Sequence, residues 1–176
     1  MSAQPSTAYY AHCDSAIGPL LVVGDAGRLM AIRLHVEAAD LGRAIEDVHH
    51  ELRGRYVLER DDERMAPVVE QVVAYVSGTR TTFDVALDLS HMTPFQQRVL
   101  LETARIPRGE TATYAEIARR AGRPGAFRAV GNTMRINPIP IVIPCHRVVA
   151  SDGIGGYGGR IETKRQLLAL EGVTRF

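Results

Sequence analysis

The residues of this chain best suited to chemistry are three consecutive ones, Cys145, His146 and Arg147. The thiolate is the nucleophilic form of cysteine, and a neighbouring imidazole or guanidinium lowers the pKa of a thiol. Because successive residues of an extended chain point to opposite faces, His146 needs a local turn or a water relay to act on Cys145. Glu171 follows the last predicted helix, where it could fold back and orient His146. The ordinary alternative for such a pair is a buried cysteine beside a surface histidine.

The segments around this triplet must position it. An apolar run over 139–144, preceded by Pro138 and ending in Pro144, predicts a short buried segment that delivers Cys145 to a fixed place. The glycine-rich loop 151–159 matches neither a Walker loop nor a dinucleotide fingerprint. Its composition suits close approach of backbone to a flat ligand, with Tyr157 as an aromatic wall.

A closing helix is predicted over 161–170. Its pattern places Lys164 and Arg165 outward and three leucines inward: Leu167, Leu168 and Leu170.

Upstream, two short helices separated by a tight turn have the spacing of a helix-turn-helix unit. A helix over 93–104, with Thr93 as N-cap and Pro94 at its first position, precedes them. Thr113 and Glu116 form a capping-box pattern that opens the next helix, which runs to Ala121. The sequence GRPG at 122–125 ends it, and a helix over 126–135 follows.

This helix pair carries a cluster of arginines: Arg119, Arg120, Arg123, Arg128 and Arg135. The cluster is typical of a surface that binds nucleic acid, and a solvated arginine face is an equal alternative.

The first half of the chain predicts an α/β arrangement. Strands over 8–13, 18–24 and 28–35 favour an antiparallel meander, because turn-forming residues separate them. Helices are expected over 37–48 and 65–76, where apolar residues recur every three or four positions. The polar stretch 59–64 is expected to be a loop or a helix start, and 81–89 an edge strand.

Composition narrows the function. The chain has 176 residues and a net charge of +1, but residues 1–90 carry 8 Lys+Arg against 14 Asp+Glu, while residues 91–176 carry 13 against 6. A basic second half favours an anionic partner. No stretch approaches 18 consecutive apolar residues, and the N-terminal residues lack the order of a signal peptide, so we expect a cytoplasmic protein with no membrane span. Cys13 and Cys145 are expected to be free thiols.

The second half resembles the O6-alkylguanine-DNA alkyltransferases, the methylated-DNA–protein-cysteine methyltransferase family. The resemblance is carried by FQQRV (95–99), GETATY (109–114), RAVGN (128–132), NPIPIVIPCHRV (137–148), GGYGG (155–159) and LALEG (168–172), and DSAIGPL (14–20) resembles the family's first hairpin. It implies an α/β (α+β) fold: an RNase H-like α/β domain in 1–90, then a mostly helical, winged-helix-like DNA-binding domain with a helix-turn-helix in 91–176. It further implies direct-reversal DNA repair, in which O6-alkylguanine and O4-alkylthymine are flipped out through the minor groove and dealkylated in a single, irreversible turnover.

The resemblance also implies roles for individual residues. Cys145 would accept the alkyl group, His146 would take its proton through water, Glu171 would hold the imidazole, and Asn137 would brace the turn before the active-site segment. Tyr114 would push the target phosphate and donate to the flipped base. The base pocket would be formed by Tyr114, Met134, Val148, Tyr157, Gly158 and Lys164. DNA would be bound by Ala126, Arg128, Ala129, Gly131, Arg135 and Arg147, with Arg128 filling the gap in the base stack.

No cofactor and no metal is expected: zinc sites in this family use N-terminal cysteine and histidine, and here only the adjacent His12 and Cys13 are near. The partner would be double-stranded DNA and the protein a monomer in solution, with cooperative binding to DNA left open.

Two departures bear on DNA docking: Phe127 replaces a usually small residue, and Arg108 a frequent tyrosine. Three histidines, His49, His50 and His91, are expected at the surface. A cysteine-dependent hydrolase or thiol transferase that uses Cys145, His146 and Glu171 without DNA is the alternative function; it leaves Tyr114 and the arginine cluster without a role.

Overall fold

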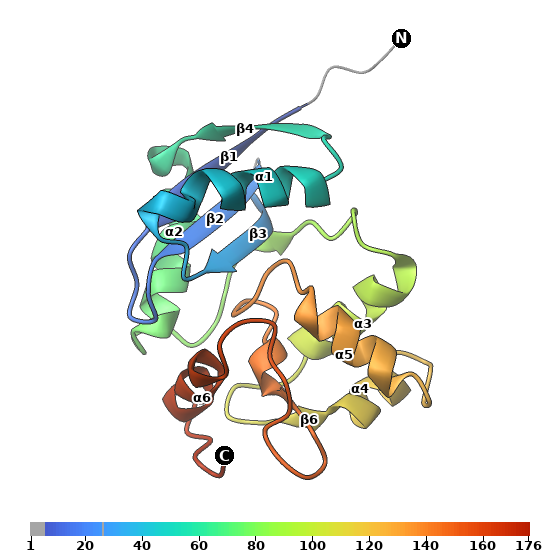
Figure 1. Cartoon of the computed structure of the whole chain (residues 1–176). Coiled ribbons are helices and arrows are strands. Elements are labelled where there is room, and N and C mark those ends of the chain that lie inside the picture. The colour runs from blue at the N-terminus through green and yellow to red at the C-terminus, as the bar shows by residue number, and fades with distance from the viewer. Residues whose placement is uncertain (1–5, 26) are drawn as a thin grey trace. The chain divides into compact units, whose positions relative to one another are not determined.

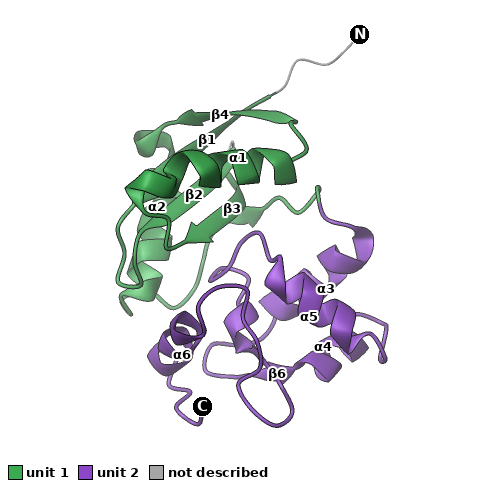
Figure 2. Ribbon diagram, viewed as in Figure 1, with its two compact units in different colours: residues 1–91 green, residues 92–176 purple. Residues whose placement is uncertain are grey.

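The computed structural model describes residues 6–25 and 27–176. The chain divides into two compact units, residues 1–91 and residues 92–176 (Figure 2). Each unit has its own secondary structure and is described separately below.

The first unit is built on a five-stranded sheet of order β4-β1-β2-β3-β5 (Figure 1). The predicted meander is confirmed: β1 (Ser6–Cys13), β2 (Leu20–Asp25) and β3 (Arg28–Leu34) pair antiparallel in sequence order. β4 (Tyr56–Arg60) pairs parallel with β1, and the short β5 (Ala86–Leu87) pairs parallel with β3. The sequence analysis missed β4, an edge strand of five residues in which Tyr56 and Leu58 are only partly buried and the other three side chains are exposed. Only two residues of the stretch expected as an edge strand, 81–89, are in a strand.

Two helices cover opposite faces of this sheet. The short η1 (Ala38–Asp40) leads into α1 (Leu41–Glu51), whose Val48 lies in the same apolar cluster as Leu21 and Val23 of β2. Tyr10 packs on that cluster, whereas the Arg64 guanidinium of α2 (Asp62–Val76) lies 4.1 Å from the ring centre of the adjacent Tyr9. Because neighbouring strand residues point to opposite faces, α2 covers the other face. Asp61 caps α2, so the polar stretch 59–64 spans a strand end and a helix start.

One expectation about burial in the first unit is also wrong. His91 is only 8% exposed, while His49 and His50 lie at the surface as predicted. The backbone carbonyl of His91 accepts a hydrogen bond from Arg53, 38 residues earlier in the chain. A contact between residues so far apart in sequence cannot be predicted from the pattern of neighbouring residue types.

The second unit is mostly helical. It contains α3 (Pro94–Ala104), α4 (Tyr114–Arg120), α5 (Phe127–Arg135) and α6 (Ile161–Leu170), with a one-turn helix η2 (Cys145–Arg147). Both predicted N-caps are confirmed: Thr93 and Thr113 each form a complete capping box. Helices α3, α4 and α5 pack on one another, which gives the predicted helix-turn-helix pair a helical support.

A two-stranded parallel ladder connects this pair to the cysteine segment. β6 (Ala112–Thr113) pairs with β7 (Val148–Val149), so Thr113 lies opposite Val149. Tyr114 follows β6 directly and the cysteine turn precedes β7 directly. The pairing therefore holds the start of α4 close to the end of the cysteine turn. In the described parts of the chain, no helix is long and apolar enough to cross a membrane.

Candidate active site

Cys145 lies at the end of a buried, braced segment. Ile139, Ile141 and Ile143 are almost completely buried, as the apolar run predicts. The Asn137 side chain closes the turn from both sides: its Nδ2 donates to the Ile143 carbonyl at 2.9 Å, and its Oδ1 accepts from Ile139 N–H at 3.0 Å. Cys145 is 4% exposed and begins η2, so the chain here turns rather than remaining extended.

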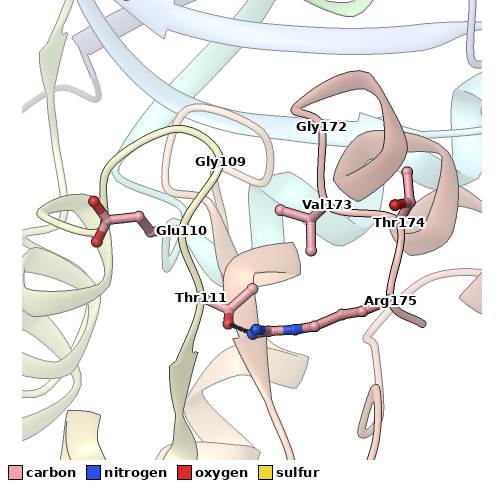
Figure 3. Close-up of a pocket in the computed structure, with 7 residues that line it drawn as sticks. All are labelled: Gly109, Glu110, Thr111, Gly172, Val173, Thr174 and Arg175. Atoms are coloured by element: carbon pink, nitrogen blue, oxygen red, sulfur yellow. Dashed lines mark hydrogen bonds between the residues drawn. The ribbon is translucent and has the colours of Figure 1, made fainter.

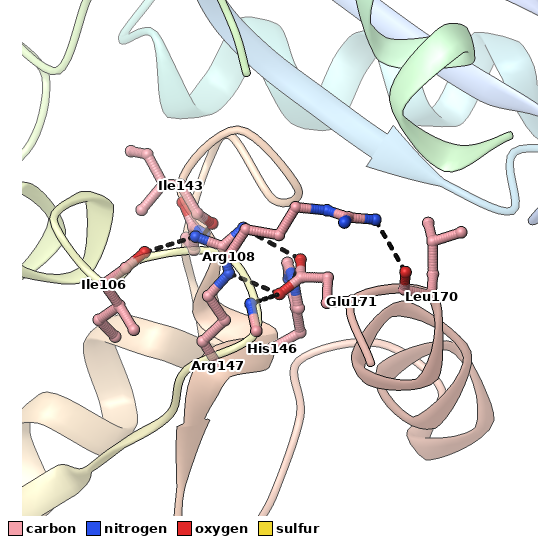
Figure 4. A network of polar contacts seen from close by, with 9 residues as sticks. Ile106, Arg108, Ile143, His146, Arg147, Leu170 and Glu171 are labelled. Carbon is pink, nitrogen blue, oxygen red and sulfur yellow. Dashed lines mark hydrogen bonds and ion pairs between the residues drawn. The ribbon is translucent and has the colours of Figure 1, made fainter. Parts of the chain in front are cut away.

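His146 and Glu171 are brought together across 25 residues of sequence. His146 Nε2 lies 2.6 Å from Glu171 Oε1, and both side chains are fully buried (Figure 4). An ionised carboxylate only accepts hydrogen bonds, so Nε2 carries the proton and Nδ1 presents a lone pair. Among the described residues, Nδ1 has no hydrogen-bond partner. It is therefore a proton acceptor without competition from another protein group.

Arg147 is part of the same network, and its expected role in DNA binding is wrong. It is 7% exposed, and its Nε and one terminal nitrogen donate to the two Glu171 oxygens at 2.8 and 3.0 Å. The other terminal nitrogen donates to the Ile106 carbonyl (Figure 4). A guanidinium that binds a carboxylate bidentately inside the protein cannot also neutralise a phosphate at the surface. Arg147 instead fixes the position of the Glu171 carboxylate through these two hydrogen bonds.

The loop before β6 holds the same carboxylate from another side. The backbone N–H of Gly109 donates to Glu171 Oε2 at 3.4 Å, and Arg108 donates to the Leu170 carbonyl at 2.8 Å (Figure 4). Arg108 thus binds the C-terminal end of α6, where a cation is favourable. This contact gives the arginine that replaces a frequent tyrosine a structural use.

Burial determines the protonation states at the centre. It raises the pKa of the Cys145 thiol above its ordinary value, against smaller opposing effects of Asn137 and the Lys164 charge. It lowers the pKa of His146, although Glu171 acts in the opposite direction. The expectation that the neighbouring imidazole and guanidinium lower the thiol pKa is wrong, because desolvation is the larger effect. The resting site therefore holds a neutral thiol and a neutral imidazole.

Lys164, expected at the surface, is completely buried. Its ammonium donates to the Val148 carbonyl at 2.7 Å and to the Gly156 carbonyl at 2.9 Å. Burial lowers its pKa to about 8, and the charge of a Cys145 thiolate would raise it. Exposure was predicted because lysine is a charged residue type, and such residues usually lie on the solvent side of a helix. Here the two carbonyls accept hydrogen bonds from the amine, which makes its burial possible.

Two tyrosines border the cysteine. The Tyr114 hydroxyl donates to the Gly156 carbonyl at 3.2 Å. The Tyr157 hydroxyl is buried without a geometrically regular hydrogen bond to any described residue, but it is near enough to Cys145 for the thiol to raise its pKa. Burial is the main reason that the pKa values of both tyrosines are raised. Both hydroxyls therefore stay protonated and able to donate.

The glycine-rich loop requires glycine at two positions. A Cβ on Gly158 would lie 2.5 Å from the Arg135 carbonyl oxygen, so this loop backbone rests directly on the end of α5. Gly155 has φ +72°, and a Cβ there would lie 3.0 Å from the Tyr114 ring. At Gly156, by contrast, a Cβ would meet nothing within 4 Å. Two of these three glycines therefore pack closely against the protein itself, while the predicted approach of the loop backbone to a flat ligand stays a prediction.

The residues predicted to bind DNA lie mostly on the outer side of α5. Arg128, Ala129 and Arg135 are exposed, and Ala126 and Gly131 are half-buried. Met134, predicted for the base pocket, is buried in the core, where the Thr103 hydroxyl of α3 lies 3.7 Å from its sulfur. Its position indicates a packing role.

A separate hollow of about 490 Å³ lies between the loop before β6 and the C-terminal residues (Figure 3). It is lined by Gly109, Glu110, Thr111, Gly172, Val173, Thr174 and Arg175. None of the predicted site residues lines it, and it contains no thiol or imidazole. Among the described residues, no three histidine, cysteine, aspartate or glutamate side chains are grouped so as to hold a metal ion.

The fold and the site define an α/β protein that combines a basic helix-turn-helix unit with a buried thiol and an imidazole–carboxylate pair on the segments packed beside it. Residues 94–173 match the model of the 6-O-methylguanine DNA methyltransferase DNA-binding domain, and residues 8–89 match that family's ribonuclease-like domain. The chain belongs to the 6-O-methylguanine DNA methyltransferase family, as the resemblance predicted.

Relatives and solved structures agree over almost the whole chain. The methylated-DNA–protein-cysteine methyltransferase of Mycobacterium tuberculosis is 42% identical over 93% of this chain and 92% of its own. The constitutive enzyme of Bacillus subtilis is 32% identical over 94% and 96%. A crystal structure of the M. tuberculosis O6-methylguanine methyltransferase superposes with a TM-score of 0.78 at 40% identity, covering 97% of this chain and 95% of that one. Another, of M. tuberculosis OGT in complex with DNA, gives 0.77 at 41% identity, covering 93% and 92%. The alternative of a hydrolase or thiol transferase that does not act on DNA is set aside.

Proposed function

We propose that this protein reverses DNA alkylation directly, by moving the alkyl group from O6 of guanine, or from O4 of thymine, to Cys145. The observation that carries the proposal is the His146–Glu171 contact of 2.6 Å, which leaves an unpartnered imidazole nitrogen buried next to the one buried thiol of the described chain. Such an arrangement prepares a thiol to lose its proton when a substrate arrives. This protein acts in the cytoplasm, where the thiols of Cys13 and Cys145 stay reduced.

The transfer begins at a neutral thiol. His146 Nδ1 accepts the Cys145 proton, and because no hydrogen bond joins the two side chains in the described structure, one water molecule relays it. The ammonium of Lys164 and the hydroxyl of Tyr157 support the sulfur as it becomes negative. Glu171 in turn stabilises the imidazolium that forms.

The sulfur then attacks the alkyl carbon. A carbon–sulfur bond forms while the bond from that carbon to O6 breaks, and the electron pair of the broken bond goes to guanine. Tyr114, whose pKa is raised, and the Gly158 backbone N–H donate to this oxygen as its charge grows. The guanine ends neutral once it has gained the proton that left the thiol. The thioether does not hydrolyse, so each molecule acts once.

The base must first leave the duplex, because a buried thiol cannot reach an atom inside a base stack. The exposed arginines of α4 and α5 bind phosphates, which gives affinity without sequence preference. Arg128, which projects from the start of α5, fills the gap in the stack. The Cys145 and Val148 carbonyls accept from the exocyclic amine of guanine, and Tyr157 forms the pocket wall.

Mass spectrometry tests this proposal. The protein is incubated with duplex DNA that contains one O6-methylguanine, and both the intact mass and the peptide with Cys145 are measured. We expect one added methyl group, on Cys145, with no further turnover when DNA is in excess. Cys145→Ser should bind the same duplex and gain no methyl group. Sustained turnover, or a methyl group on Cys13, would contradict the proposal.

A further inference from the structure

Helix α5 exposes an aromatic ring at its first residue. Phe127 is 49% exposed, although the same helix buries Val130, Thr133 and Met134. The other phenylalanine near this helix pair is used inside the unit: the guanidiniums of Arg98 and Arg123 lie 6.0 and 5.2 Å from the centre of the Phe95 ring. Phe127 is more exposed than Phe95, and the guanidinium near its ring belongs to the adjacent residue, Arg128.

Its position on the helix places this ring beside the residues that handle the nucleotide. Residues four apart lie on one side of a helix, so Phe127 shares a side of α5 with Gly131. A Cβ on Gly131 would lie 4.0 Å from the Tyr114 ring, which places this side of α5 next to Tyr114. The Arg128 guanidinium lies 6.0 Å from the centre of the Phe127 ring. Phe127 thus lies beside the expected finger residue and one helical turn from the residue of α5 that faces Tyr114.

The charge around the ring indicates what covers it. No acidic residue occurs between Glu116 and Asp152, while five arginines occur over 119–135. Glu116 itself is engaged with Thr113 in the capping box of α4. A hydrophobic protein partner would have to desolvate this positive surface, whereas duplex DNA neutralises it.

We propose that Phe127 is an apolar wedge that enters the minor groove beside Arg128 and unstacks the base step next to the extruded nucleotide. Apolar side chains inserted between base steps partially unstack those bases and kink the duplex. A base must be unstacked before it is extruded, so the wedge contributes to that step. The inference rests on the proposed function, because it assigns a second inserted side chain to the same DNA surface. The contact that it assigns to Phe127 is apolar, in contrast to the ionic contacts of the surrounding arginines.

The lack of charge gives the wedge a distinct signature. Loss of a phosphate contact reduces the dependence of log K on log salt by about one. Loss of a stacking contact weakens binding without changing that slope, and stacking of one base on an aromatic ring is worth about 5- to 150-fold in affinity. Phe127 and Arg128 are thereby distinguishable in one titration series.

The experiment uses the full chain in a Cys145→Ser background, with a duplex that carries O6-methylguanine beside a fluorescent adenine analogue whose emission rises on unstacking. Four proteins are compared: the parent, Phe127→Ala, Phe127→Tyr and Leu101→Ala. Leu101 is a matched control, since it is also 49% exposed but lies on α3. Dissociation constants are measured at several salt concentrations. In proteins that retain Cys145, the rate of methyl transfer from the duplex is divided by the rate of transfer from the free O6-methylguanine base. This ratio corrects for any change in the pocket itself, because the free base does not need to be extruded from DNA.

We expect Phe127→Ala to weaken binding about tenfold with an unchanged salt slope, to lose most of the emission increase, and to lower the transfer ratio about tenfold. Phe127→Tyr and Leu101→Ala should resemble the parent. The wedge proposal is overturned if Phe127→Ala resembles the parent, or if the salt slope of Phe127→Ala falls. It is also overturned if Leu101→Ala loses as much affinity and emission increase as Phe127→Ala. If the parent with Cys145 transfers no methyl group, the proposed function fails, while the binding and emission data still decide the wedge because they do not use transfer.

Discussion

Glu171 joins His146 to Arg147: one carboxylate oxygen lies 2.6 Å from His146 Nε2, and the same carboxylate accepts two hydrogen bonds from the Arg147 guanidinium. The two residues that follow Cys145, His146 and Arg147, are therefore coupled through Glu171, which lies 25 and 24 positions further along the chain. Arg147 fixes the position of the carboxylate, and the carboxylate orients the His146 imidazole.

Glu171→Gln should slow methyl transfer. The amide keeps the size of the side chain but loses the charge that raises the pKa of His146, so the imidazole becomes a weaker base. We expect transfer from the free O6-methylguanine base to fall by about 10- to 100-fold. Binding of unmodified duplex should stay unchanged, since Glu171 is buried. An unaltered rate at pH 7 would remove Glu171 from the mechanism.

Arg147→Met should destabilise the protein rather than weaken phosphate contacts. The change leaves the Glu171 carboxylate buried without its guanidinium, and breaking a buried ion pair in this way costs about 3–5 kcal/mol. Urea unfolding monitored by circular dichroism measures the loss. Arg128→Ala is the matched comparison, because Arg128 is exposed: it should leave stability unchanged and reduce the salt slope of DNA binding by about one. A reduced salt slope for Arg147→Met would restore its role in DNA binding.

Lys164→Met should change the pH dependence of Cys145 reactivity. The pKa of Lys164 is lowered to about 8, so its ammonium is charged below pH 8 and loses its proton as the pH rises through that value. While charged, it lowers the pKa of the Cys145 thiol. The variant should therefore react severalfold more slowly with iodoacetamide at about pH 7, and the difference should narrow above pH 8.

Cys13 provides an internal reference for that measurement, because the same digest reports both thiols. The ratio of alkylated Cys145 to alkylated Cys13 is followed between about pH 6.5 and 9.5 by peptide mass spectrometry. A ratio that differs from the parent by the same factor at every pH would show that the lysine charge does not act on the thiol.

Gly158→Ala and Gly156→Ala should differ sharply although they lie two residues apart. The new methyl at 158 would lie 2.5 Å from the Arg135 carbonyl oxygen, so the loop must move away from α5. At 156 the methyl meets nothing within 4 Å. We expect Gly158→Ala to lose more than about tenfold in transfer from duplex DNA, since small displacements of catalytic groups cost about 100-fold. Gly156→Ala should stay within about twofold of the parent. Equal effects of the two variants would exclude the close contact as the cause.

Local sequence determined much of the second unit. Both capping boxes, the tight stop between α4 and α5 and the buried apolar run before Cys145 follow from residue types within a few positions of one another. Such features depend on hydrogen bonds and side-chain periods that close within one or two turns of chain. The same holds for the β1–β2–β3 meander, whose turns are short.

The tertiary structure decided where the charged residues lie and which thiol chemistry is available. The sequence placed Lys164 on the outward side of a helix and Arg147 at a DNA contact, yet both are buried. The Val148 carbonyl, 16 residues from Lys164, and Glu171, 24 residues from Arg147, accept their hydrogen bonds. The burial of Cys145 itself raises the pKa of its thiol, since desolvation outweighs the opposing effects of its neighbours, Lys164 among them. Sequence thus identified the reactive triplet, but only the folded chain could set its protonation state, because desolvation is a property of the surrounding atoms and not of the residue.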